Sequence, residues 1–312
     1  MNTPARLGAY VLALAALFGA TLAAGSAVGG PASGEHPSSG EPAPHAAPGE
    51  PAAGQQVPGG LQISQDGYTL NPLTTGLTPG KATGLRFTVT GPDGAPVTRY
   101  RVEHDKKLHL IVVARDLSGY QHLHPELSPG GVWEVRLTVP RAGAYRMFAD
   151  FTPEGGAGVT LGADLHAAGD YAPQPPPAAS RTATVDGYTV TLEGELLPGR
   201  SSGLTLKVTR GGRPVTDLQP YLGAYGHLVV LRAGDLAYLH VHPEGEPGDG
   251  TTASGPEITF QAEVPAPGDH RLFLDFQHDG VVRTAEFTAT AGAAAGPRPS
   301  PVATGAPGGH GH

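Results

Sequence analysis

Two short phrases in the sequence place histidines at a spacing that could bind a metal ion. The segment YQHLHPE holds His122 and His124, and the segment YLHVHPE holds His240 and His242. In an extended strand, residues two positions apart point to the same face, so each pair of imidazoles projects together. Neutral imidazole is a common ligand of divalent transition metals. The repeated phrase therefore favours metal ligation over chance surface histidines.

A further histidine lies on the strand expected before the first pair. His109 stands in the apolar run LHLIVVA, which ends just before the turn sequence DLSG. If this turn joins two strands without a bulge, Val113 lies opposite His122 and Ile111 lies opposite His124. His109 then shares their face, diagonal to His124. We therefore predict a three-histidine site of His109, His122 and His124.

The second phrase is preceded by the same arrangement. His227 begins the apolar run HLVVL, and the same count puts Val229 opposite His242 with His227 diagonal to it. This predicts a second, separate site of His227, His240 and His242. Satisfied polar packing of the histidines at sheet ends is the alternative interpretation.

Two carboxylates could complete these sites. Asp150 lies in the apolar segment MFADF and Asp275 lies in LFLDF. A carboxylate in such surroundings needs a partner, so it either ligates the ion or orients a histidine ring. Met147 alternates away from the Asp150 face, which disfavours a thioether Cu(I) site. Imidazole with carboxylate suits Cu(II), Zn(II) or Ni(II), and Cu(II) binds most tightly of the three.

Composition excludes several classes of function. The formal net charge is -8 and no run of Lys or Arg could follow a phosphate backbone, so a nucleic acid partner is not expected. The chain has no cysteine, which removes disulfides, thiolate metal sites and thiol catalysis. A cation is the more plausible partner of an acidic chain.

The chain reads as a tandem duplication. The phrases DGYTL, LTPGKATGLRFTVT and VPRAGAYRMFADF recur as DGYTV, LLPGRSSGLTLKVT and VPAPGDHRLFLDF. Short runs rich in Val, Leu, Thr and aromatic residues alternate with Gly, Pro and Asp turns, which predicts an all-β fold of two tandem Ig-like β-sandwiches. The predicted segments are a signal peptide or signal anchor at 1–30, a Gly/Pro-rich linker at 31–60, repeat 1 at 61–172, a Pro-rich linker at 173–180, repeat 2 at 181–291 and a tail at 292–312.

The N-terminal segment indicates a location outside the cytoplasm. Residues 7–28 contain no charged side chain and follow Arg6. Such a stretch is long enough to form a membrane-spanning helix, and Gly25 and Ala27 offer a signal-peptidase site. The protein is therefore expected to be secreted, or tethered to the cytoplasmic membrane through residues 7–28 if they are not cleaved.

The first repeat also resembles a known group. From VEHDKKLHLIVVARDLSGYQHLHPEL to YRMFADFTP it is similar to extracytoplasmic bacterial β-sandwich proteins described as heavy-metal or copper associated, and more loosely to CopC-like and YtkA-like domains of cupredoxin-type architecture. The resemblance implies metal handling and adds His104 to the candidate ligands. The chain departs from the group at Leu108 and, in the second repeat, at Gly226, where relatives often have methionine. The second repeat also has Leu222 where a counterpart of His104 would stand.

These observations favour a binding protein. We expect an exported protein that binds a divalent transition metal, with copper favoured, for buffering or delivery in the cell envelope. The first alternative is a structural or interaction module of the envelope, whose partner would be another envelope protein. It is motivated by Ile111, Val113, Val229 and Leu231, which make the histidine face apolar enough to be covered. A metal-dependent enzyme is the third reading, disfavoured because neither repeat contains a nucleophile elbow, a phosphate loop or a paired acid.

Overall fold

The described part of the chain is built from β-strands. The computed structural model describes residues 57–239 and 241–292, which belong to one compact unit beginning at Gln56. Within these residues no α-helix is present, and nothing helical among them could cross a membrane. The predicted signal or anchor segment, most of the linker at 31–60 and nearly all of the tail lie outside the described residues.

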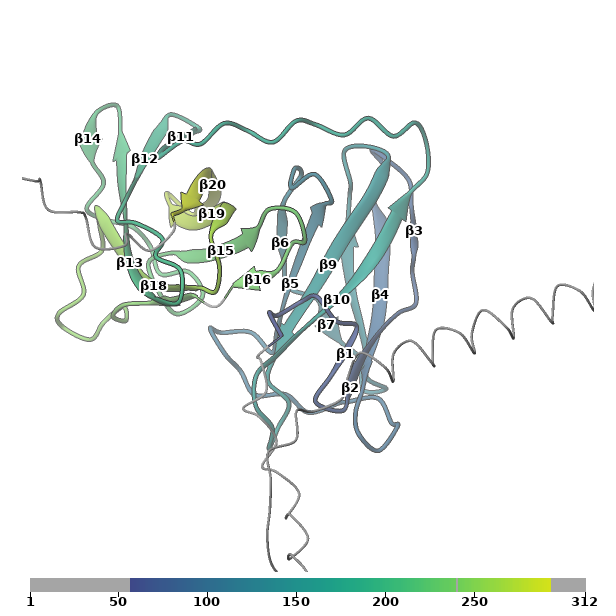
Figure 1. The fold of residues 1–312 in the computed structure, drawn as a ribbon. Helices are drawn as coiled ribbons and strands as arrows, with labels where there is room; N and C mark the ends of the chain where they lie inside the picture. Colours follow the sequence, from purple (N-terminus) through teal and green to yellow (C-terminus); the bar gives the residue numbers. More distant parts are fainter. Residues whose placement is uncertain (1–56, 240, 293–312) are drawn as a thin grey trace, which may run out of the picture. The chain divides into compact units, whose positions relative to one another are not determined.

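The first repeat contains two five-stranded sheets, with strand orders β1-β2-β4-β8-β7 and β3-β10-β9-β5-β6. Neighbouring strands are antiparallel, except that β3 runs parallel to β10. Figure 1 shows these strands in blue to teal. Their bounds are β1 Ser64–Gln65, β2 Tyr68–Pro72, β3 Gly76–Leu77, β4 Thr83–Thr90, β5 Leu108–Ala114, β6 Gln121–Leu123, β7 Glu126–Leu127, β8 Val132–Leu137, β9 Gly143–Phe151 and β10 Val159–Ala167.

The second repeat has the same plan. One sheet has the order β11-β12-β13-β18-β17, with β14 paired to β13, and the other has the order β16-β15-β19-β20. Figure 1 shows these strands in green to yellow. Their bounds are β11 Thr182–Val185, β12 Tyr188–Glu193, β13 Arg200–Arg210, β14 Arg213–Pro214, β15 His227–Arg232, β16 Tyr238–Leu239, β17 Val241–Pro243, β18 Glu257–Val264, β19 Gly268–His278 and β20 Val281–Ala291.

Sequence patterning explains why these runs form sandwiches. In β4, Leu85, Phe87 and Val89 are buried, while the residues between them are exposed or half-buried. A period of two buries one face of a sheet against its partner sheet. Each repeat has its own apolar core between its two sheets. The prediction of an all-β fold with two tandem Ig-like β-sandwiches is confirmed.

Strand β5 is buried on both faces, as its apolar sequence predicted. Leu110 and Val112 point into the core of the first repeat, whereas Ile111 and Val113 point to the opposite face and join a different cluster. In the second repeat β15 behaves in the same way, with Val230 in the core and its two neighbours on the other face. These two central strands therefore each contribute to two apolar clusters.

The second face of these strands forms an inter-repeat cluster, because its residues come from both repeats. The ring of Tyr120 stacks on Phe273 with centroids 4.0 Å apart, and the ring of Tyr238 packs against Phe148 at 5.8 Å. Burying one large apolar side chain stabilises a fold by about 1.5–3 kcal/mol, so this contact between repeats is substantial. The buried members of the inter-repeat cluster are Ile111, Val113, Leu117, Phe148, Val229, Leu231, Leu236 and Phe273.

The first described residues are also held against both repeats. The backbone N–H of Tyr238 donates to the carbonyl oxygen of Gly59 over 2.9 Å. The buried guanidinium of Arg146 donates to the carbonyl oxygens of Gly60 and Leu61, at 2.6 and 3.0 Å from Nη2. A charged donor that satisfies two carbonyls fixes this segment firmly. The segment therefore adds backbone contacts to the side-chain contacts of the inter-repeat cluster.

We expect Gly60→Ala to destabilise the protein more than Gly80→Ala. Both glycines have positive φ, +73 and +69°, so the backbone cost of an alanine is similar at the two positions. A Cβ at Gly60 would lie 2.3 Å from Cδ1 of Phe148, whereas a Cβ at Gly80 meets nothing within 4 Å. Overpacking typically costs about 1–3 kcal/mol. Chemical denaturation of both variants measures the difference, and equal midpoints would contradict the packing described for Gly60.

Candidate metal site

In the first repeat, the strand pairing differs from the predicted register but keeps the predicted face. Ile111 lies opposite His122, not Val113. The cause is the turn, because Leu117, at φ 63°, donates its N–H to the carbonyl of Ala114 and pairing resumes only beyond it. The register shift is two residues, so every side chain stays on its face. His109 and His122 therefore share one face, as predicted.

In the second repeat, the predicted triad does not form as expected. Leu239 lies opposite Val230, so the register that put His242 opposite Val229 is wrong. After β16 the chain crosses to the other sheet, where His242 pairs with Gln261 of β18. The side chain of His242 is exposed. The remaining predicted member, His240, lies outside the described residues.

The structure instead brings histidines of the two repeats together. Nδ1 of His109 lies 3.1 Å from Nε2 of His122, and a nitrogen of His227 lies within 4.8 Å of both. The rings of His109 and His227, which are equivalent in the two repeats, stack at 5.3 Å with an interplanar angle of 13°. Three imidazole nitrogens thus converge beside the inter-repeat cluster. Sequence analysis placed them in two different sites.

The other ring nitrogens of His109 and His122 identify the tautomers. Nε2 of His109 lies 3.1 Å from the carbonyl oxygen of Glu103, which can only accept, so Nε2 carries the hydrogen. Nδ1 of His122 lies 2.8 Å from Oδ2 of Asp275, so the His122 hydrogen is on Nδ1. For neutral rings, the two nitrogens that face each other at 3.1 Å both present lone pairs. Two lone pairs at this distance form a place where a cation could bind.

Asp275 is the carboxylate that orients this site. Its Oδ2 accepts from His122 and its Oδ1 accepts from the hydroxyl of Thr284 over 2.6 Å. The side chains of Asp275 and His122 are each 2% exposed. Asp150, the equivalent residue of the first repeat, lies opposite His109 on β9 and accepts from Thr160 over 2.8 Å. A carboxylate that holds a histidine ring is a frequent feature behind metal ligands.

Two more predicted histidines lie around the three. The His124 ring is 4.7 Å from the His122 ring, and its Nε2 is buried without a hydrogen-bond partner among the described residues. Nδ1 of His227 is unpartnered in the same sense. His104 is exposed, with its ring 6.0 Å from the ring of His109. Two buried nitrogens without a protein partner therefore lie close together and are available to a ligand.

Burial keeps these rings neutral. Desolvation, with a smaller contribution from the neighbouring His122 ring, lowers the pKa of His109 to about 4. The same causes lower the pKa of His124 to about 3. Burial also lowers the pKa of His227 well below its usual value. His109, His124 and His227 are therefore held in the neutral form, in which an imidazole can bind a metal.

A cavity of about 510 Å³ adjoins the cluster and connects it with the surface. His109 forms part of its wall, together with His104, His242 and Asp150. This cavity gives an ion a route to the buried nitrogens. It also brings His242 and Asp150, which belong to different repeats, to one opening.

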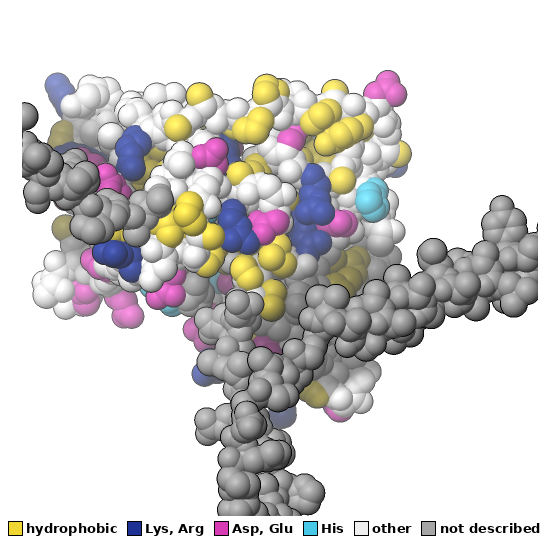
Figure 2. Space-filling model, in the orientation of Figure 1, with side chains coloured by type: hydrophobic (Ala, Val, Ile, Leu, Met, Phe, Trp, Pro, Cys, Tyr) yellow, Lys and Arg dark blue, Asp and Glu magenta, His cyan; other side chains and the backbone are white. Residues whose placement is uncertain are grey.

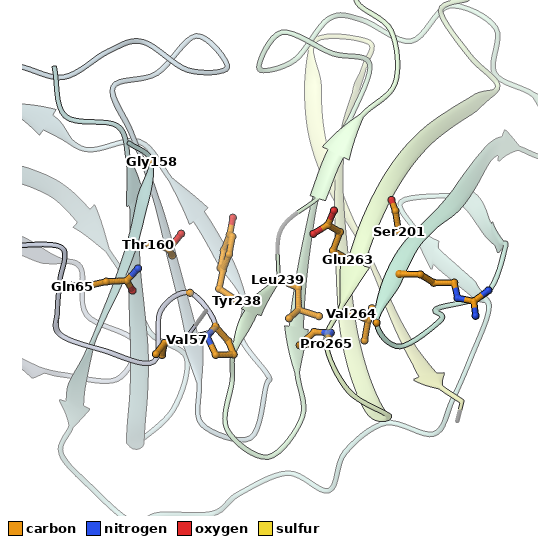
Figure 3. A pocket seen from close by; sticks show the side chains of 14 residues that line it. Val57, Gln65, Gly158, Thr160, Ser201, Tyr238, Leu239, Glu263, Val264 and Pro265 are labelled. Carbon is orange, nitrogen blue, oxygen red and sulfur yellow. The ribbon is translucent and has the colours of Figure 1, made fainter. Parts of the chain in front are cut away.

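A second cavity, of about 590 Å³, contains none of the described histidines. Figure 3 shows Gln65 and Thr160 on one side, Leu239 and Glu263 on the other, and Tyr238 between them. Its wall holds few ionisable groups and no cluster of them, so it offers little for catalysis. On the face drawn in Figure 2, basic and acidic side chains are interspersed.

Two histidines of the second repeat lie away from the cluster. Nδ1 of His270 donates a hydrogen bond to the carbonyl oxygen of Gly268 over 2.9 Å. His278 lies between the hydroxyl of Tyr188 and the carboxylate of Asp217, at 2.7 and 3.0 Å. Hydrogen bonds account for both ring nitrogens of His278, whereas Nε2 of His270 is buried without a hydrogen-bond partner among the described residues. One sequence signal could have located the site shared by the two repeats. The face that carries the histidines is apolar, so another part of the protein was expected to cover it.

A family profile described as a domain of unknown function, DUF8832, matches the chain twice, at residues 62–168 and 183–293. The two matches confirm the tandem duplication. No curated protein sequence matches the chain.

Solved structures give weaker matches. The Escherichia coli adhesin FdeC has 13% identity over 74% of this chain and 65% of its own, with a TM-score of 0.25. Invasin, described as a bacterial integrin-binding protein, has 14% over 72% and 39%, with a TM-score of 0.22. A Salmonella alpha-2-macroglobulin has 13% over 75% and 15%, with a TM-score of 0.26. The chain thus spans 15% to 65% of the length of these three proteins. Scores this low carry no functional argument, and these matches give no support to the CopC-like resemblance.

The metal-free protein should lose stability as the pH falls from 6.5 to 4. Folding lowers the pKa of His109 to about 4, so the unfolded chain binds more protons within this window. Stability is therefore fully present above pH 6.5 and declines below it, by about 2 kcal/mol at pH 5 for His109 alone. Denaturation in the presence of a chelator at pH 7.5 and 5 measures the loss. His109→Gln should reduce the pH dependence, while the exposed control His166→Gln should not. An unchanged dependence in His109→Gln would contradict the burial described here.

Proposed function

We propose that this chain, which belongs to the family of DUF8832 domains and carries two copies of the domain, binds a divalent transition metal ion between its repeats. The observation that carries the proposal is the pair of facing lone pairs on His109 and His122, 3.1 Å apart. Two nitrogen ligands of one tetrahedral zinc, each about 2.0–2.1 Å from the metal, lie about 3.3 Å apart. The spacing therefore fits two ligands of one ion.

His227 supplies the third nitrogen, and His124 is the candidate for the fourth. Both have a buried nitrogen with no hydrogen-bond partner in the described part of the chain. The low pKa values of His109 and His124 support ligation, because an imidazole must be neutral to bind a metal. Asp275 and the carbonyl of Glu103 hold two rings in the tautomers that ligation needs.

The donor set favours particular ions. Three or four imidazoles suit Cu(II), Zn(II) and Ni(II), with Cu(II) bound most tightly by the usual affinity order. The thioether of Met147 lies in the core of the first repeat and cannot add a soft ligand. We therefore favour Cu(II). The role would be buffering or delivery outside the cytoplasm, a location that rests on the uncharged segment 7–28.

The second candidate function is an interaction module of the cell envelope. The observation that favours it is the inter-repeat cluster, because the apolar histidine face is used for contact between domains. In this reading the histidines are polar packing within that contact. If the protein is such a module, no metal should stabilise it at any pH, so metal-binding measurements separate the two functions.

We expect His122→Ala and His227→Ala each to abolish tight metal binding. Each removes one ligand of the same ion although the residues belong to different repeats. Losing a ligand should cost more than about 100-fold in affinity, since the loss of a residue behind a ligand already costs 10–100-fold. Calorimetric titration of the chelator-treated full chain with Zn(II) and Cu(II) at pH 7.5 is the measurement.

The control is His166→Ala, which changes an exposed histidine and should leave the affinity unchanged. If His122→Ala weakens binding and His227→Ala does not, the joint site is wrong and the histidines of the first repeat bind alone. If the unaltered chain neither binds these ions nor gains thermal stability from them, the interaction module is the better reading.

Asp275→Asn should weaken metal binding by about 10–100-fold. The amide has nearly the same shape as the carboxylate but lacks the charge that orients His122 and strengthens it as a ligand. The matched control is Asp269→Asn, because Asp269 also accepts a threonine hydroxyl at 2.6 Å, but on the exposed part of the same strand. Equal affinities of the two variants would argue against a supporting role for Asp275.

A further inference from the structure

The candidate ligands come from two repeats that are connected along the chain by an exposed linker. His109 and His122 belong to β5 and β6, and His227 begins β15. An ion held by all three would connect the two sandwiches directly. The linker at 173–180 is exposed along its whole length, so its own contribution is to keep the repeats at high effective concentration.

The contact between the repeats has a two-fold character. Tyr120 of the first repeat packs on Phe273 of the second, and Tyr238 of the second packs on Phe148 of the first. These two pairs are equivalent in the duplicated sequence. Reciprocal contacts of this kind are typical of an isologous interface. The stacked pair of His109 and His227 is likewise formed by equivalent residues, so the ion would sit where the two copies meet.

Without a cation, this part of the contact is unfavourable. The lone pairs of His109 and His122 face each other, and buried nitrogens of His124 and His227 have no partner among the described residues. An unsatisfied buried polar group costs roughly 1–3 kcal/mol. Separation of the repeats would return these nitrogens to water. The metal-free contact is therefore held by apolar packing and by the hydrogen bond from His122 to Asp275, against a polar penalty that an ion removes.

We propose that the ion is a clamp between the repeats, so that metal occupancy controls whether the apolar inter-repeat cluster stays buried. This inference rests on the proposed metal binding and adds its regulatory consequence. A ligand that binds the associated state better than the separated state must shift the equilibrium toward association. Reciprocally, association of the repeats must raise the affinity for the metal. Metal release then weakens the contact formed by Tyr120, Phe148, Tyr238 and Phe273.

The test separates the repeats covalently while they are folded. A protease recognition sequence is inserted into the full chain between Pro177 and Ala178, where the linker is exposed, and the folded protein is cut. A fluorophore on each half then reports their association at pH 7.5 by energy transfer, with a chelator or with saturating Zn(II). We expect the dissociation constant to fall by about tenfold or more with the metal, within the usual range of coupling.

Two control variants and two further measurements make each outcome decisive. His227→Ala in the cut protein should keep the apolar contact but lose the effect of Zn(II), and His166→Ala should retain it. If the halves do not separate at any dilution, the exchange of a labelled half with an unlabelled one is timed, and Zn(II) should slow it by about tenfold or more. Zn(II) titration of the uncut chain is measured in parallel.

The results distinguish the clamp from the binding function. If the uncut chain binds Zn(II) while association and exchange of the halves are the same with and without it, the clamp is refuted and the metal site stands. If the uncut chain does not bind Zn(II) or Cu(II), the proposed function itself fails, and the clamp with it.

Discussion

The candidate metal site depends on two imidazole nitrogens, Nδ1 of His109 and Nε2 of His122, that face each other across 3.1 Å. The carbonyl of Glu103 and the carboxylate of Asp275 take the hydrogens of His109 and His122 on the far sides of the rings. Both acceptors are themselves fixed, Glu103 by backbone hydrogen bonds with Lys106 and Asp275 by Thr284. The rings therefore cannot exchange tautomers without losing a buried hydrogen bond. A positive ion is the simplest way to satisfy both nitrogens.

A duplicated domain could have built two equivalent sites, yet the described residues assemble one. The reason is the apolar composition of the histidine face. Ile111, Val113, Val229 and Leu231 would be exposed if each repeat stood alone, and exposure of about a few hundred Å² of contiguous apolar surface is unfavourable. Covering each face with the other brings the equivalent histidines 109 and 227 into a stack. The hydrophobic contact thus determines which histidines meet.

Much of the fold was predictable from local patterns. The alternation in β4 and the internal repeat both depend on the sequence alone, and both correspond to what is observed. The common face of His109 and His122 was predictable for the same reason, because the period of a strand is two residues. The predicted register was wrong, because Leu117 adopts a left-handed conformation in the turn. The prediction of a common face was still correct, because the register shifted by an even number of residues.

The composition of the site was not predictable, because it depends on contacts between distant parts of the chain. His242 was assigned to the strand beside His227, but the chain changes sheets after Leu239. A local pattern cannot reveal such a crossing, since an extended segment can pair on either sheet. Likewise, nothing in the local sequence of His227 indicates that its neighbours are His109 and His122 of the other repeat. The apolar histidine face indicated that another surface packs against it, but not that this surface belongs to the other repeat.

For the proposed ion, the surroundings of the cluster favour exchange over permanent retention. The nitrogens are buried, but the cavity of about 510 Å³ beside them also has the exposed His104 and His242 in its wall. An ion can pass from such peripheral imidazoles to the central ones without losing all of its ligands at once. The central ligands are neutral, and Asp275 is the carboxylate hydrogen-bonded to one of them, so a divalent ion leaves a net positive charge in a buried place. Charge buried without full compensation weakens binding, which suits an ion that is taken up and released rather than one that is needed for folding alone.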